Sequence, residues 1–279
     1  MATAGVLALG LSSCGTSPAG SSEQAGPTSS PSPSVEAPVE LTQASFVEEL
    51  TAAQSEAETV HLTMTYSGAG AEAGGLTGAP LEADINVADP ENPAMAMQMD
   101  MEGETTDTIL VDGDFYMNMG EMTSGRYLSL AEAAESDNPM AGIFGAMGEI
   151  MQSSLKDMDP AAQLQGMDGA ITSFEKTGTE TVDGVETDVY TMLLDPAKMT
   201  GPQVDDLPED ALAQVGEMEM VYNVDQDNLA RKLVLTMDLE GQPLVMNGEF
   251  SAWGEPIDVA APTGDQLVSL DELMEGLGG

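Results

Sequence analysis

The chain has 279 residues, and its 49 Asp and Glu against 6 Lys and Arg give a formal net charge of −43. So acidic a balance argues against nucleic-acid binding, which needs clustered basic side chains to displace counterions from phosphates. The single Cys and single His exclude an intramolecular disulfide and a Cys/His zinc cluster. No apolar run reaches the ~18 residues that a membrane-spanning helix needs.

The N-terminal residues indicate a secreted protein. Residues 4–14 form a short apolar stretch that ends in small residues and Cys14, which is typical of a secretory signal and its processing site. The motif Leu11-Ser12-Ser13-Cys14 resembles a bacterial lipobox, which implies lipidation of Cys14, palmitate included, and cleavage just before it. Residues 1–13 are therefore predicted to be a signal-peptide remnant. Because they contain no Lys or Arg, we expect the true start of the precursor to lie upstream.

Residues 14–41 are predicted to form a tether. They are rich in Ser, Pro, Gly and Thr, a composition that cannot bury a core. A random coil of this length reaches ~30 Å. The lipid on Cys14 is expected to hold the domain at the outer face of the cytoplasmic membrane, as a lipid-anchored protein of the cell envelope.

Residues 42–279 are predicted to form one domain, mainly β with helices. Thr42 is expected to cap a helix that buries Phe46 and Leu50. Alternation of apolar and polar side chains then predicts half-solvated antiparallel strands. This alternation covers residues 60–66, 81–87, 95–101, 115–119, 218–224, 229–239 and 244–250.

The turn residues support this interpretation. Asp112-Gly113 and Asp183-Gly184 have the chemistry of two-residue hairpin turns, and residues 225–228 predict another reversal. We expect about ten or eleven strands, and a sheet of that size curls. The predicted fold is one strongly curved antiparallel sheet, a half-barrel.

An insert at residues 139–168 is predicted to form a helical lid on the concave face of the sheet. Asn138-Pro139 indicates a helix start, and Asp159-Pro160 indicates the start of a second, shorter helix. The first helix carries an apolar stripe interrupted by three glycines, each of which weakens a helix by ~1 kcal/mol. We therefore expect a soft lid.

The order of these segments resembles the actinobacterial LppX/LprG-type lipoproteins and, more distantly, the LolA/LolB lipoprotein carriers. The resemblance is carried by the hairpins at residues 111–116 and 182–190 and by the closing segment at residues 250–256. It implies a half-barrel whose concave side, roofed by helices, holds acyl chains of lipids or glycolipids.

The candidate cavity residues are mostly methionines, whose flexible and polarizable side chains suit varied acyl chains. An ordinary Met-rich core is one alternative. Binding of Cu(I) by thioethers is another, although no His or Cys joins the cluster. The candidates are Leu62, Met64, Ile85, Met95, Met97, Met99, Met101, Met117, Ile143, Phe144, Met147, Met151, Met220 and Leu235.

Two functions from different classes follow. The first is a carrier or chaperone that buries acyl chains and moves lipids across the cell envelope. The second is an interaction or envelope-sensing module with a filled core. The expected partners are an acyl lipid or glycolipid with a neutral head group, the membrane through the anchor, and a membrane transporter. The domain is expected to be a monomer.

No enzyme activity, cofactor or metal is expected. The sequence has no Gly-x-Ser-x-Gly elbow and no phosphate loop. Cys14 is expected to carry lipid instead of acting as a nucleophile. His61 falls on the polar face of its predicted strand and is expected to be a solvated surface side chain.

The anchor can be tested by Cys14→Ala in a precursor with a complete signal. Loss of the thiol should block lipidation and move the protein out of the detergent phase, because stable anchoring needs two or more acyl chains. Ser13→Ala, which keeps a small residue beside the cleavage site, is the control. Detergent partitioning that is unchanged by Cys14→Ala would contradict the predicted anchor.

Overall fold

The computed structural model describes residues 40–77, 80–89, 92–101, 104–156, 166–167, 169–200, 215–239 and 241–277. They belong to one unit, Glu40–Gly279, which starts two residues before the predicted domain boundary at Thr42. The predicted signal remnant, Cys14 and nearly all of the predicted tether lie outside the described residues. So does the predicted helix start at Asp159-Pro160.

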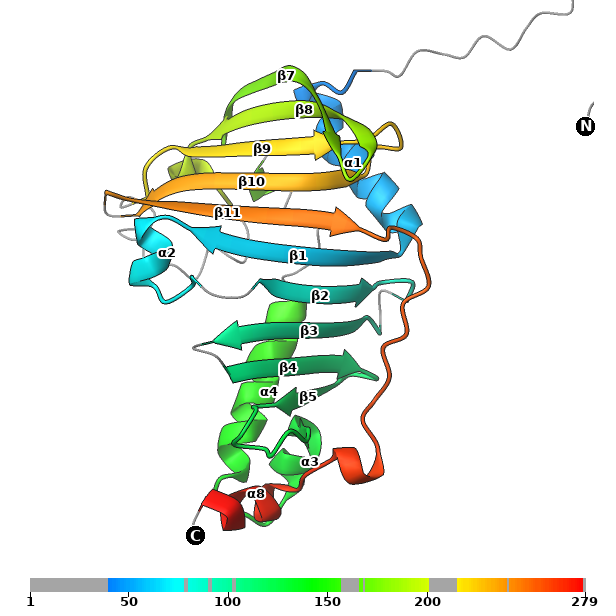
Figure 1. Cartoon of the computed structure of the whole chain (residues 1–279), viewed down its shortest axis with the longest axis vertical. Coiled ribbons are helices and arrows are strands. Elements are labelled where there is room, and N and C mark those ends of the chain that lie inside the picture. The colour runs from blue at the N-terminus through cyan, green and yellow to red at the C-terminus, as the bar shows by residue number, and fades with distance from the viewer. Residues whose placement is uncertain are drawn as a thin grey trace, which may run out of the picture. The chain divides into compact units, whose positions relative to one another are not determined.

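Eleven strands of the described chain form one antiparallel sheet (Figure 1). The strands are β1 Thr59–Ser67, β2 Leu81–Asn86, β3 Ala94–Met101, β4 Glu104–Val111, β5 Asp114–Asn118, β6 Leu128–Ser129, β7 Ile171–Val182, β8 Val185–Leu194, β9 Met218–Val224, β10 Ala230–Leu239 and β11 Gln242–Ser251. Their order is β6-β5-β4-β3-β2-β1-β11-β10-β9-β8-β7, so two meanders join through β1 and β11. The sheet is open, with β6 and β7 at its edges, and the predicted half-barrel class is confirmed.

The predicted turns are confirmed. Both residues of Asp112-Gly113 have positive φ, 53° and 77°, and those of Asp183-Gly184 have 49° and 84°. This is the backbone of a two-residue turn that matches the twist of paired strands. The reversal between β9 and β10 includes Asn228, with a φ of 60°.

The strand register gathers the apolar side chains on one face of the sheet. Side chains alternate along a strand, and directly paired residues point the same way. One row across β8, β9, β10, β11 and β1 consists of Met192, Met220, Leu235, Met246 and Tyr66. A second row, across β1 to β5, consists of Leu62, Ala83, Met97, Thr108 and Met117. The predicted alternation therefore produces one apolar face that spans both meanders.

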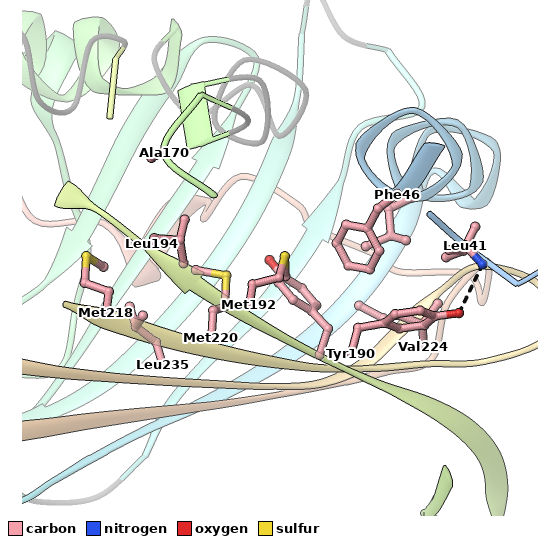
Figure 2. Close-up of a cluster of buried hydrophobic side chains, with 13 residues drawn as sticks. Leu41, Phe46, Ala170, Tyr190, Met192, Leu194, Met218, Met220, Val224 and Leu235 are labelled. Carbon is pink, nitrogen blue, oxygen red and sulfur yellow. Dashed lines mark hydrogen bonds between the residues drawn. The ribbon is translucent and has the colours of Figure 1, made fainter. Parts of the chain in front are cut away.

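Helix α1 (Gln43–Ala57) covers the β7–β9 end of this face. As predicted, Thr42 caps it, in a reciprocal box with Ser45. The ring centroid of Phe46 lies 5.2–5.5 Å from those of Phe174, Tyr190 and Tyr222. Figure 2 shows Phe46 above the sheet beside Tyr190, whose hydroxyl accepts a hydrogen bond from the Leu41 backbone N–H at 3.2 Å.

Three helices pack at the β4–β6 end: α3 (Leu130–Glu135), α4 (Ala141–Lys156) and α8 (Leu270–Leu277). Phe144 and Met151 of α4 pack against a buried cluster that includes Leu110 and Phe115. Since these residues share the apolar face with the aromatic cluster under α1, α1 and α4 lie on the same side of the sheet, behind the strands in Figure 1. The short helix α2 (Ala69–Ala73) follows β1.

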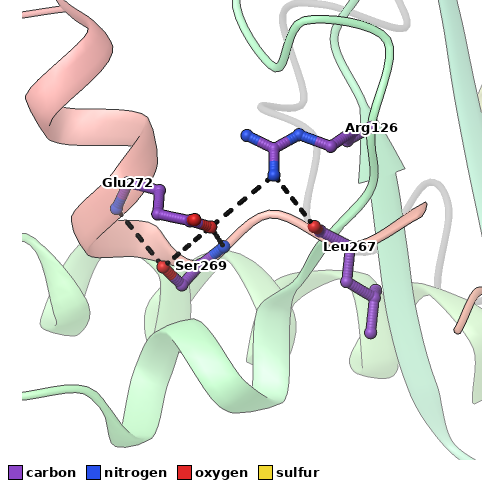
Figure 3. A network of polar contacts seen from close by, with 4 residues as sticks. All are labelled: Arg126, Leu267, Ser269 and Glu272. Carbon is purple, nitrogen blue, oxygen red and sulfur yellow. Dashed lines mark hydrogen bonds and ion pairs between the residues drawn. The ribbon is translucent and has the colours of Figure 1, made fainter. Parts of the chain in front are cut away.

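The C-terminal segment fastens α8 to the β6 edge. The backbone of Leu267 forms a parallel bridge with Tyr127, and the Arg126 guanidinium contacts the Leu267 carbonyl at 3.2 Å and the Glu272 carboxylate at 3.6 Å (Figure 3). Ser269 and Glu272 cap α8 reciprocally. The Ser269 backbone N–H, followed by Arg126, lowers the pKa of the Glu272 carboxyl.

The aromatic cluster under α1 should dominate the stability of its end of the sheet. Phe46→Ala should lower the free energy of unfolding by about 3–5 kcal/mol, because the buried ring is lost and a cavity remains. Glu48→Ala, on the exposed side of the same helix, should change it by no more than ~0.5 kcal/mol. Urea unfolding followed by far-UV circular dichroism measures both. Equal midpoints would contradict the packing described for α1.

Candidate functional site

The centre of the apolar face is less covered than its two ends. Under α1 and under α4 many inward side chains are buried, as in Tyr190 and Phe115, and partly buried ones such as Met117 pack against them. On β1, β2 and β3, most inward side chains are only half-buried and belong to none of the buried clusters formed by the described residues. We call these residues the central strip: Leu62, Met64, Tyr66, Leu81, Ile85, Met97 and Met99.

The structure divides the predicted cavity residues of the strands into three groups. Leu62, Met64, Ile85, Met97 and Met99 lie in the central strip. Another pair, Met95 and Met117, packs against the cluster of Leu110 and Phe115. The third group, Met220 and Leu235, is buried in the cluster under α1. Met101 lies in β3 opposite Glu104, and its side chain lies outside the described residues.

The predicted apolar stripe of α4 is divided between two directions. Phe144 and Met151 pack toward the sheet, whereas Ile143 and Met147 have 54% and 37% of their surface exposed. A helical stripe as wide as the predicted one cannot face a single neighbour. Part of the apolar surface of α4 is therefore open to solvent.

Two of the three glycines in α4 face α3. A Cβ on Gly145 would lie 3.4 Å from the Ala134 methyl group, and one on Gly148 would lie 3.9 Å from Leu130 Cβ. Both distances are ordinary van der Waals contacts, so the packing of α4 on α3 would accept alanine at these two positions.

A small apolar pocket lies beneath α1, in the region of Figure 2. Its volume is about 10 Å³, roughly the room that one water molecule needs. The lining residues are Phe46, Val47, Met167, Ile171, Met192, Leu194, Met220 and Tyr222. Only Met220 among them is a predicted cavity residue, while Phe46 is predicted as a buried residue of the helix. The core under α1 is thus filled by the protein's own side chains.

Tyr66, Tyr190 and Tyr222 place polar hydroxyl groups on the apolar face. Tyr66 donates a hydrogen bond to the Met64 thioether sulfur at 2.9 Å, and burial raises the pKa of Tyr66. Tyr190 accepts the Leu41 N–H. Burial raises the pKa of Tyr222 to about 12.

Five of the six Lys and Arg side chains are described, and these five are paired with carboxylates. Arg231 contacts the buried Asp225 at 2.6 Å. The other pairs are Lys176–Asp188, Lys232–Glu180, Lys198–Asp195 and Arg126–Glu272. Each cation therefore stabilises the fold locally, and the net charge gives an anionic ligand an unfavourable surface.

His61 has a partner that sequence reasoning missed. Its Nδ1 lies 2.7 Å from Asp84 Oδ1, a residue paired with it across β1 and β2 on the polar face. In the part of the chain that the structure describes, no three His, Cys, Asp or Glu side chains converge to hold a metal ion. Nor is any described helix long and apolar enough to cross a membrane.

An open antiparallel sheet with helices on its apolar face defines a half-barrel of the kind that the sequence motifs predicted. No family model and no curated protein sequence matches the chain. Among solved structures, LprF from Mycobacterium bovis is 15% identical with a TM-score of 0.49, and the match covers 80% of this chain and 97% of LprF. The lipoprotein LppX from Mycobacterium tuberculosis is 17% identical with a TM-score of 0.48, covering 78% and 100%. A LolA superfamily protein from Nitrosomonas europaea is 10% identical with a TM-score of 0.26, covering 76% and 92%.

Alkaline titration tests the burial of Tyr222. The folded protein holds this proton to about pH 12, while an unfolded tyrosine releases it near ~10. The unfolded state therefore binds fewer protons in this range, and the free energy of unfolding should fall as pH rises from ~10. Tyr222→Phe should make that fall shallower in urea titrations at several pH values. An identical decline in the two proteins would contradict the assignment.

Proposed function

We propose that this protein is an extracytoplasmic lipoprotein, anchored to the outer face of the membrane through Cys14, that binds acyl chains of lipids or glycolipids and carries or chaperones them across the cell envelope. The observation that supports this most directly is the half-buried central strip. It is an apolar surface that the described helices leave less covered than the rest of the same face.

The chemistry of the strip suits acyl chains. Burying one CH₂ group stabilises a complex by ~0.8 kcal/mol, so even a partial chain provides substantial affinity. Met64, Met97 and Met99 can adapt to different chains at little strain. The exposed Ile143 and Met147 of α4 do not pack with Phe144 and Met151 toward the sheet and are not part of the strip.

The net charge of the protein supports a neutral or sugar-rich head group. The five described basic side chains are engaged in ion pairs, while the whole chain carries a formal charge of −43. A polyanionic head group would meet repulsion without a cationic contact to offset it. Delivery of the lipid would require a further acceptor, and a membrane transporter is the partner we propose. Binding by a monomer, without catalysis, is sufficient for this function.

A second candidate is a non-transport module that docks a partner protein or senses the state of the envelope. The pocket of about 10 Å³ under α1 supports it, because that part of the core is filled. In this alternative the central strip would meet a protein surface instead of a lipid.

Met97→Glu tests lipid binding on the central strip. A carboxylate at this position would have to be desolvated by an acyl chain, at a cost of several kcal/mol unless it stays protonated. We expect the affinity for a fluorescent fatty acid to fall at least ~tenfold at neutral pH and to recover partly in acid.

Thr65→Glu is the matched control, because it adds the same charge to an exposed position on the opposite face of β1. It should leave the affinity within about twofold of wild type. Wild-type protein that binds no fluorescent fatty acid would overturn the lipid-binding function. Equal losses in the two variants would show that net charge, and not the strip, decides binding.

A further inference from the structure

Tyr66 is the polar residue of an otherwise apolar strip. Its hydroxyl donates to the Met64 sulfur at 2.9 Å, and both side chains project from the same face of β1. A thioether is a weak hydrogen-bond acceptor. The hydroxyl therefore has a partner much weaker than the carbonyl or carboxylate oxygens that buried tyrosines usually bind.

The hydroxyl of Tyr66 is available as a hydrogen-bond donor. Burial raises the pKa of its hydroxyl, so it remains protonated and neutral at physiological pH. It pairs across the strands with Met246, which is apolar. A neutral oxygen acceptor brought to this position would replace the thioether sulfur and form the stronger bond.

Tyr66 lies at the end of β1, where its hydroxyl could bind the polar end of an acyl chain that lies along the strand. Tyr66 is the last residue of β1 on the apolar face, because the strand ends at Ser67. Going back along the strand, the next residues on this face are Met64, Leu62 and Val60. The six residue steps from Tyr66 to Val60 span ~20 Å. An acyl chain in a membrane occupies half of a hydrocarbon core of ~30 Å, or ~15 Å. A chain that starts at Tyr66 thus fits along β1.

We propose that Tyr66 is a specificity-determining residue that recognises the ester carbonyl of an acyl lipid by donating its hydroxyl hydrogen. The acyl chain then lies along β1 over Met64 and Leu62, and the head group stays at the end of the strand. This inference rests on the proposed function and narrows its ligand to neutral ester-linked lipids, as against ether-linked lipids of the same chain length.

The test compares two probes that differ only at the linkage. Dipalmitoylglycerol has ester carbonyls, and dihexadecylglycerol has ether oxygens with chains of similar length. Each competes with a fluorescent fatty acid for the full-length protein, and the ratio of the two affinities is the ester preference. Four proteins are compared: wild type, Tyr66→Phe, Met64→Leu and Tyr116→Phe.

We expect wild type to prefer the ester by about two- to tenfold, the range that one net hydrogen bond provides. Tyr66→Phe should abolish this preference and leave ether affinity within about twofold. Tyr116→Phe removes a hydroxyl on the opposite face of the sheet, beside Ile109, and should keep the preference. Met64→Leu removes the competing sulfur, so its preference should equal or exceed that of wild type.

The failures are distinguishable. If wild type binds both probes equally, or if Tyr66→Phe keeps the ester preference, the role of Tyr66 is overturned while the lipid-binding function stands. A lower ester preference in Met64→Leu also overturns it, because removal of a competing acceptor cannot weaken a hydrogen bond from Tyr66 to the ester carbonyl. If wild type binds neither probe, the proposed function falls and this inference falls with it.

Discussion

The width of the apolar face is the constraint on which the rest of the structure depends. An open sheet of eleven strands with one apolar side presents more surface than one helix can cover. Apolar surface that stays in contact with water costs free energy roughly in proportion to its area. Helices cover the apolar face at the two ends of the sheet, with α1 at one end and α3, α4 and α8 at the other. The strands between them remain half-covered.

The sheet topology bears on why the centre of the apolar face is the least covered part. Strands β6 and β7 are sequence neighbours at opposite edges of the sheet, so the chain between them joins the two ends of the sheet. Met151 belongs to the cluster at the β4–β5 end, and Met167 packs against the cluster under α1. The described parts of this connection therefore lie at the two ends of the apolar side, and the described residues cover its centre less.

Charge separates the two faces of the sheet and restricts their roles. Acidic side chains such as Glu82, Asp84 and Glu249 lie on the polar face by the strand register, opposite the methionines. The five described Lys and Arg side chains are paired with carboxylates. A strongly negative protein stays soluble despite a half-buried apolar strip, and the same charge favours neutral ligands.

Local sequence patterns predicted seven of the eleven strands by alternation, together with the two Asp-Gly turns and the Thr42 cap, because each depends on neighbours within a few residues. The sequence analysis did not predict helix α8. Ser269 and Glu272 have the spacing of a capping box at its start, and Leu270 and Leu273 lie on its buried side. Other features depend on distant segments. The pairing of β1 with β11 and the split of the α4 stripe, with Phe144 inward and Ile143 outward, follow from tertiary packing that no local pattern encodes.

The central claim is that the half-covered strip holds an acyl lipid. Native mass spectrometry of full-length protein, extracted from its own membranes without added lipid, tests it most directly. The account predicts a mass excess over the denatured, lipidated chain that organic extraction recovers as a neutral ester-linked lipid. A native mass equal to the denatured mass, in protein that also takes up no lipid from neutral vesicles, would contradict it.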